Sequence, residues 1–142
     1  MTVIGFNFNK ISASREKAPK GKISVNRTCK PTSVSEVTIG GGQKALRYEF
    51  IFSVEYKPEV ASMEFTGHLV ELVKEEEHKK ILDSWEENEQ LPPASLERVM
   101  NELLDRCHVE ALIMSKELSI PAPIKLPSVK VKQSGETETK NE

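Results

Sequence analysis

Cysteines, histidines and clustered carboxylates are the residues of this chain that could do chemistry, and their spacing decides which chemistry is open to them. Cys107 and His108 are neighbours in a segment with helical periodicity. Adjacent side chains on a helix point about 100° apart, so these two cannot share a metal ion or form a nucleophile–base pair. Cys29 and His68 lie in strand-like segments, and nothing in their spacing requires them to meet. The sequence therefore predicts no metal site and no catalytic cysteine.

Carboxylates and glycines give no stronger candidate. The run Glu75–Glu77 opens a helical pattern, where acidic side chains interact favourably with the helix dipole. Catalysis by paired carboxylates would need them in a cleft. The run Gly40–Gly42 leads into a strand rather than a helix N-terminus, which favours a hairpin connection over a phosphate-binding loop. We therefore expect a protein that is not an enzyme, with no cofactor and no small-molecule substrate.

Length and composition bound the class of protein. The chain has 142 residues, of which 37% are hydrophobic and 30% charged, enough for one domain with a real core. It contains no apolar run long enough to cross a membrane and no secretory signal. Two cysteines cannot make a disulfide framework, which favours the reducing cytoplasm. We expect a single cytoplasmic domain over residues 1–130, without membrane insertion, and a disordered polar tail over 131–142.

Positive charge is concentrated near the N-terminus. Between residues 10 and 30 seven basic side chains face Glu16 alone, a net charge of +6. These seven, the N-terminal cations, are Lys10, Arg15, Lys17, Lys20, Lys22, Arg27 and Lys30. A basic strand–loop region over 1–31 could bind RNA phosphates or an acidic protein surface. It could equally be a solvated, lysine-guarded edge strand, because no aromatic residue lies between Phe8 and Tyr48 to stack on bases.

The strongest structural signal is a long alternating strand. Every even position from Leu46 to Tyr56 is apolar, which predicts an antiparallel strand over 46–56 with one wet face. Together with the return strand, it builds an aromatic face from Tyr48, Phe50, Phe52, Tyr56 and Phe65. That face has two interpretations. It is ordinary core beneath a helix, or it is a groove that binds apolar segments of client polypeptides.

Three other segments have strand character. Alternation predicts strands over 1–11 and 22–29, followed by a turn near Pro31 and a short extended piece over 37–39. The return strand covers 60–73, and its apolar residues change face after Gly67, which predicts a bulge there.

Two helices follow the strands. The spacing of His78, Ile81, Leu82 and Trp85 predicts a short amphipathic helix. A second helix is expected over 93–118, long enough to lie across the sheet. Its C-terminal half is apolar on two sides, because Val109, Leu112 and Ile113 lie opposite the main stripe. We expect these three and Trp85 to form an interface with a second copy, although an internal segment is the alternative.

The order of these elements, the helix entry Leu91-Pro92-Pro93 and the proline-rich stretch 120–129 resemble the SecB-like family of export chaperones. The resemblance implies an α+β fold, in which a curved antiparallel sheet of about four strands carries a short and a long helix on one face. It also implies assembly into dimers or higher oligomers.

Two functions follow as expectations. The first is a chaperone-like binding protein that holds extended or unfolded polypeptides. The second is a ribosome-associated factor, for example a dimeric hibernation factor, that contacts rRNA or ribosomal proteins through the N-terminal cations.

Overall fold

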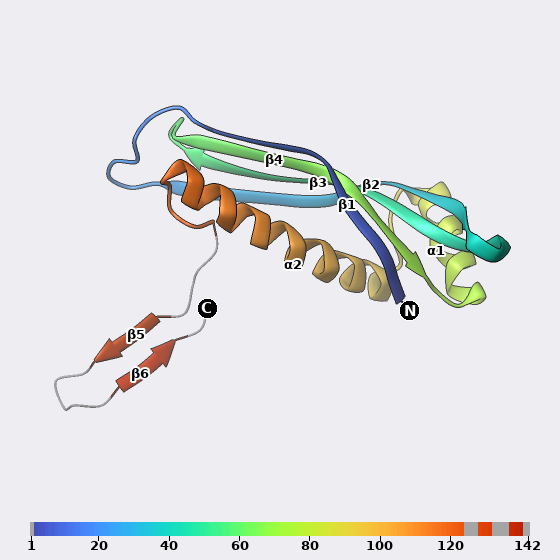
Figure 1. Cartoon of the computed structure of the whole chain (residues 1–142). Helices are drawn as coiled ribbons and strands as arrows, with labels where there is room; N and C mark the ends of the chain where they lie inside the picture. Colours follow the sequence, from blue (N-terminus) through green and yellow to red (C-terminus); the bar gives the residue numbers. More distant parts are fainter. Residues whose placement is uncertain (1, 124–127, 132–136, 141–142) are drawn as a thin grey trace.

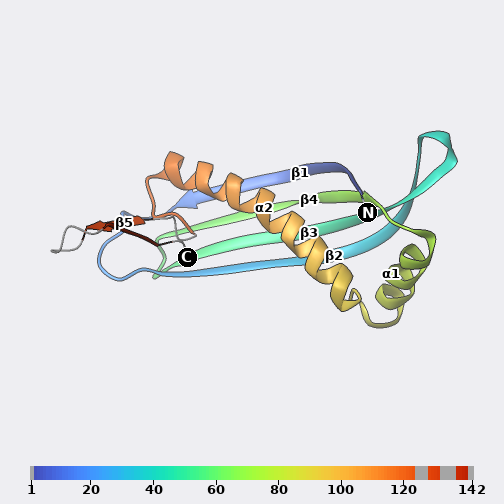
Figure 2. The same ribbon diagram turned by 90° about the horizontal axis from the view of Figure 1, so that it is seen from below.

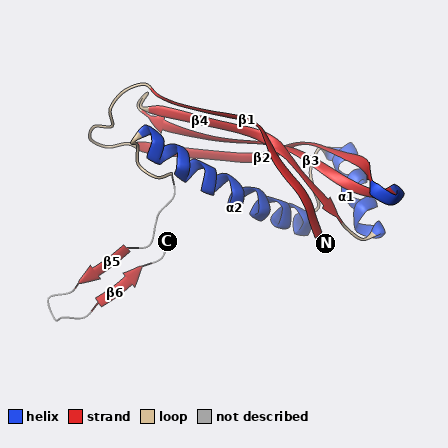
Figure 3. Cartoon of the chain, in the orientation of Figure 1, coloured by secondary structure: helices blue, strands red, loops and turns tan. Residues whose placement is uncertain are grey.

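The structure is a computed structural model that describes residues 2–123, 128–131 and 137–140. Its body is an antiparallel sheet of four strands in the order β1-β4-β3-β2, with helices on one face (Figures 1 and 3). The elements are β1 (Thr2–Arg15), β2 (Ser24–Ile39), the 3-10 turn Gly40–Gly42, β3 (Gln43–Lys57), β4 (Ala61–Leu72), α1 (Glu75–Asn88), α2 (Pro93–Leu118), β5 (Ser128–Val131) and β6 (Thr137–Lys140). The predicted α+β class, with four strands and a short and a long helix, is confirmed.

The core lies between the sheet and α2. The even residues of β3 and the odd residues of β4 point to the same side, as in the pair Phe52 and Phe65. Helix α2 runs diagonally across this face (Figure 2). It buries one side chain every four residues, at Ser95, Val99, Leu103, Cys107, Ala111 and Ser115. A four-residue step turns slowly around a helix, so the buried stripe follows this diagonal path.

The edge strand β2 corrects one prediction. The sequence predicted a strand over 22–29, a turn at Pro31 and a separate extended piece over 37–39. The structure instead has one continuous strand that pairs with β3 along its whole length, with a register shift between Pro31 and Ser33. Proline lacks a donor for the ladder, but on an edge strand the N–H side faces solvent and a bulge absorbs the irregularity.

The first strand bends where it crosses Gly67. β1 pairs with β4 out to Arg15, four residues beyond the predicted end, and its register shifts between Phe8 and Lys10. Phe8 lies opposite Gly67 at this point. A Cβ on Gly67 would sit 2.1 Å from the carbonyl oxygen of Asn7, so no other residue fits without moving β1. The irregularity lies on β1, opposite Gly67. β4 itself keeps its register with β3 through Gly67 and buries its odd positions throughout, so the predicted change of face within the return strand is wrong.

A buried polar network joins the sheet to both helices. Glu71 on β4 is fully buried. Its Oε1 accepts a hydrogen bond of 2.6 Å from the Tyr48 hydroxyl and one of 2.8 Å from the Arg98 guanidinium of α2. Arg98 also pairs with Glu77 of α1. One guanidinium therefore fixes the relative positions of β4, α1 and α2.

Proton affinities in this network follow from its contacts. Burial works to lower the pKa of Arg98, but its hydrogen bonds and charge attraction to Glu71 and Glu77 outweigh that and raise it. Burial, followed by the hydrogen bond to Glu71, raises the pKa of the Tyr48 phenol. Arg98 and Tyr48 therefore both keep their protons at every physiological pH.

The structure describes part of the segment 131–142, for which the sequence predicts a disordered polar tail. Within 131–142 the structure describes β6, which pairs with β5 in an antiparallel ladder that sets Ser128 opposite Lys140. Val129, Val131, Thr137 and Thr139 are β-branched residue types, and such residues favour strands even in a polar segment.

Replacing Gly67 by alanine should destabilise the protein. The added methyl group overlaps the backbone of Asn7, and such overpacking costs about 1–3 kcal/mol. Urea denaturation should show the midpoint falling for Gly67→Ala. Gly5→Ala is the matched control, because a Cβ there meets only Val70 at 3.8 Å, an ordinary contact. Equal midpoints for the two variants would contradict the crossing geometry.

Replacing Arg98 by methionine should destabilise the fold more than any surface charge change. The substitution leaves the buried Glu71 carboxylate without its cation, which costs about 3 kcal/mol. Lys10→Met is the control, because it breaks the exposed Lys10–Glu64 pair and should cost about 0–1 kcal/mol. Both values come from chemical denaturation at pH 7. A loss for Arg98→Met no larger than for the control would refute the network's role.

Candidate functional site

The aromatic face predicted to bind clients lies in the core. Tyr48, Phe50, Phe52, Tyr56 and Phe65 are each at most 1% exposed. Helix α2 covers them, and the Tyr56 hydroxyl donates a hydrogen bond of 2.6 Å to the carbonyl of Pro121 just beyond that helix. In this structure these five side chains have the position of ordinary core. A polypeptide cannot touch them while α2 stays in place.

An accessible apolar groove lies instead between β1 and α2. Phe6 and Phe8 form its floor, and the exposed Val109 forms part of its rim. The groove has a volume of about 470 Å³. Both rings are supported from below, because Phe6 stacks on Phe50 with ring centroids 5.4 Å apart and Phe8 meets the edge of Phe65 at 5.7 Å. The predicted aromatic face therefore supports the groove rather than lining it.

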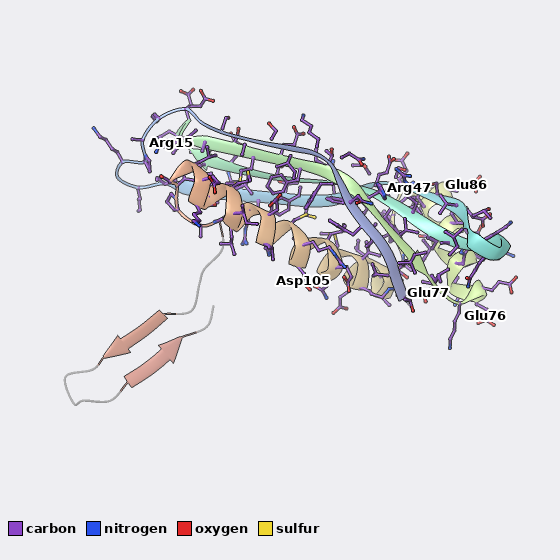
Figure 4. All side chains as sticks on the ribbon, in the orientation of Figure 1. Arg15, Arg47, Glu76, Glu77, Glu86 and Asp105 are labelled. Carbon is purple, nitrogen blue, oxygen red and sulfur yellow. The ribbon has the colours of Figure 1, made fainter. Side chains whose placement is uncertain are left out.

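Charged side chains of α2 border the groove. The Arg106 guanidinium lies 5.0 Å from the centre of the Phe6 ring, a cation–π contact, and it pairs with Glu102 one turn earlier. Asp105 completes the rim and lies on the side of α2 away from the sheet (Figure 4). Arg106 thus partly covers an aromatic surface that a ligand could reach by displacing a flexible side chain.

The two edges of the described sheet are protected very differently. β2 carries Arg27, Lys30 and Pro31, which are typical of edges that resist pairing with other strands. The first eight residues of β1, Thr2–Asn9, contain no charge and no proline. Ile4 in this stretch is 42% exposed. The unguarded edge adjoins the groove, because Phe6 and Phe8 belong to the same stretch.

The predicted self-association residues lie on the outside of α2 and on α1. Val109 is 58% exposed, Ile113 is 47% exposed and Leu112 is half-buried. Trp85 packs partly against the core from α1. Val109 belongs both to this flank and to the rim of the groove, so the two surfaces are continuous. Trp85 comes from a different element and does not line the groove.

The N-terminal cations are all exposed, but they do not form one compact patch. Lys10 is on β1 and pairs with Glu64 at 3.2 Å. Lys17, Lys20 and Lys22 belong to the connection between β1 and β2. Arg27 and Lys30 lie on the edge strand β2. Arg15 lies at one end of the molecule, while Glu76 and Glu86 of α1 lie at the other (Figure 4). Arg15 and these two carboxylates therefore lie far apart along the long axis of the molecule.

The thiols and imidazoles form no catalytic constellation in the described parts of the chain. Burial raises the pKa of Cys29 to about 11 and that of Cys107, aided by Cys29, to about 12. His78 bonds Glu36 at 2.7 Å, which lowers the pKa of that carboxyl. No group of three metal-ligating side chains occurs among the residues described. Neither described helix is long and apolar enough to cross a membrane.

Sequence reasoning missed Phe6, Phe8 and Arg106 as site residues. The signal for the first two was present, since they alternate with asparagines in a stretch without charge, Thr2–Asn9. Arg106 follows Glu102 by four residues, a spacing typical of a helical ion pair. Its position over Phe6 depends on how α2 crosses the sheet, which no local pattern specifies.

Comparisons with known proteins support the fold. No family model matches the sequence, and no curated protein matches it. Among solved structures, the chain is similar to the Mycobacterium tuberculosis Rv1957 SecB-like chaperone in complex with a ChAD peptide from the Rv1956 HigA1 antitoxin. The TM-score is 0.56 with 11% sequence identity, and the match covers 85% of each chain. The fold is therefore SecB-like, as the resemblance of the sequence predicted.

His108, beside the groove-bearing half of α2, should titrate below the ordinary histidine value. Burial lowers its pKa, the charge of Arg27 lowers it further, and Asp105 partly opposes both. Histidine NMR titration should place the pKa below the ordinary value of about 6.5, and Arg27→Gln should raise it only in part, because burial is the larger cause. A pKa lowered by folding makes stability fall as the pH drops below about 6.5. A normal pKa in both proteins would contradict this placement.

Proposed function

We propose that this SecB-like chain is a self-associating protein that holds extended or unfolded polypeptides and is not an enzyme. The observation that carries the proposal is the apolar groove of Phe6, Phe8 and Val109 beside the unguarded edge of β1. The similar mycobacterial structure is a SecB-like chaperone in complex with a peptide, which supports polypeptides as the class of ligand.

Two interactions would hold a client. Apolar side chains of an extended segment would enter the groove above Phe6 and Phe8. Its backbone would pair with the N–H and C=O groups on the outer side of β1, which is an edge strand of the described sheet. Each large apolar side chain contributes about 1.5–3 kcal/mol before the cost of ordering the client. A few such contacts give modest affinity, which suits reversible holding better than permanent binding.

The acidic side chains at the rim of the groove would make the site prefer clients with basic residues. Glu102 and Asp105 stand beside the groove, and Arg106 is already paired with Glu102. A basic client side chain could replace that guanidinium as the partner of Glu102 while Arg106 swings off Phe6. An acidic client residue would meet repulsion from the same two carboxylates.

Self-association belongs to the same proposal. Val109, Leu112 and Ile113 expose apolar surface that the sheet cannot cover, because they lie away from it on α2. A second copy is the partner that we propose for this flank, and dimers or larger oligomers would follow. Trp85 stays a predicted contributor, but its position on α1 makes it peripheral to a contact centred on Ile113.

The ribosome-associated alternative stays a prediction. It rests on the exposure of the N-terminal cations, which are spread over a loop and two edge strands. No observation beyond their charge favours nucleic acid. A cytoplasmic location likewise stays a prediction from the cysteine count.

Placing a charge on the groove rim should weaken client holding. Val109→Asp should lower the affinity for an extended apolar peptide roughly tenfold, the loss expected for one apolar contact. Fluorescence anisotropy with a labelled peptide and light scattering of an aggregating reporter protein would measure it. Leu96→Asp is the matched control, an exposed leucine of the same helix outside the groove.

Assembly must be followed in the same samples, because Val109 serves both surfaces. Light scattering coupled to size exclusion should show a smaller mass for Ile113→Asp, with peptide binding retained. If Val109→Asp and Leu96→Asp hold peptide equally well, the groove is not the client site.

A further inference from the structure

The two cysteines of the chain lie on facing elements of one interface. Cys29 on β2 stands opposite Phe52 of β3, so it points to the side of the sheet that α2 covers. The Phe52 ring in turn lies 5.8 Å from the ring of His108, the neighbour of Cys107. Cys107 belongs to the buried stripe of α2 that faces the sheet. Both thiols therefore enter the layer between β2 and α2.

Their electrostatics agree with this placement. After burial, the charge that Cys29 would carry as a thiolate is the second cause that raises the pKa of Cys107, whereas burial alone raises the pKa of Cys29. Cys29 is half-buried and Cys107 fully buried. Polypeptide holding uses neither thiol, so a role for this pair is independent of that proposed function.

We propose that Cys29 and Cys107 form a reversible disulfide that fastens α2 to the edge strand β2 when the protein meets a low-molecular-weight disulfide. The Cys29 thiolate, the more accessible of the two, attacks one sulfur of the reagent and releases one small thiol. The Cys107 thiolate then attacks the Cys29 sulfur of this mixed disulfide and releases the second small thiol. Two protein thiols are oxidised and one small disulfide is reduced to two thiols.

The bond would change how firmly α2 is held. It closes a loop of roughly 80 residues, and such a cross-link stabilises a fold mainly by restricting the unfolded chain. It also pins the middle of α2 over β2, on the opposite side of that helix from the groove. The oxidised protein keeps its aromatic core covered, while the groove between β1 and α2 stays open.

The test uses the full chain and oxidised glutathione as the reagent. After incubation, the protein is denatured and alkylated without reduction, and its mass is measured by mass spectrometry. We expect a mass lower by about 2 Da with no alkylated cysteine, and a tryptic peptide that joins residues 28–44 to residues 107–116. The melting temperature should rise by roughly 5–15 °C and return to its starting value after reduction. Cys29→Ser should leave Cys107 unmodified, because that thiol is buried.

Three outcomes would overturn the proposal: two alkylated cysteines, a glutathione adduct that persists on Cys29, or a disulfide between two copies. Cys107→Ala provides the complementary control. It should accumulate the mixed disulfide at Cys29, since the resolving thiol is absent. If Cys107→Ala instead accumulates no mixed disulfide and still shows the same rise in melting temperature as the unmodified sequence, the assigned pairing is wrong.

Discussion

The positions of both helices on the sheet depend on one buried carboxylate, which needs a cation and hydrogen-bond donors as partners. Glu71 is buried on β4, and a buried charge is tolerated only when it is paired and hydrogen-bonded. The Tyr48 hydroxyl supplies one partner from the neighbouring strand, and Arg98 supplies the cation from α2. Because Arg98 also pairs with Glu77, α1 is fixed by the same guanidinium. Buried apolar contacts supply most of the stability, and the network specifies where each helix sits.

The position of α2 in turn decides which surfaces are available for binding. By crossing the sheet diagonally, the helix covers the aromatic residues of β3 and β4 and comes close to β1 at Phe6 and Phe8. The groove forms where the bend of β1 at Gly67 and the path of α2 meet. A charged, proline-bearing β2 and an uncharged half of β1 then leave only one described edge suited to pairing with another strand. The surface proposed to bind clients is therefore a consequence of how α2 closes the core.

Local patterns predicted the elements but not their use. The alternation from Leu46 to Tyr56 and the apolar stripe of residues 93–118 are repeated signals, so β3 and α2 were correctly predicted. Pro31 interrupts the apolar alternation of β2, so a turn was predicted there. The structure has a continuous strand, because an edge strand tolerates a proline. The aromatic face was recognised, but its burial depends on the helix that covers it, and two interpretations stayed open. Glu71 gave no sign of its role, because its partners are 23 and 27 residues away.

Val109 links the two halves of the proposed function. It forms part of the groove rim and also begins the apolar flank that continues through Ile113. A second copy seated on that flank would extend the rim and deepen the groove, if it stops short of Phe6. If it reached over Phe6, it would exclude the client, and assembly and holding would oppose each other. Arg106 lies at the groove end of this continuous surface, because its guanidinium lies over Phe6, and Val109 follows it by three residues on α2. The extent of the contact around this arginine therefore determines whether oligomers bind clients better or worse than single copies.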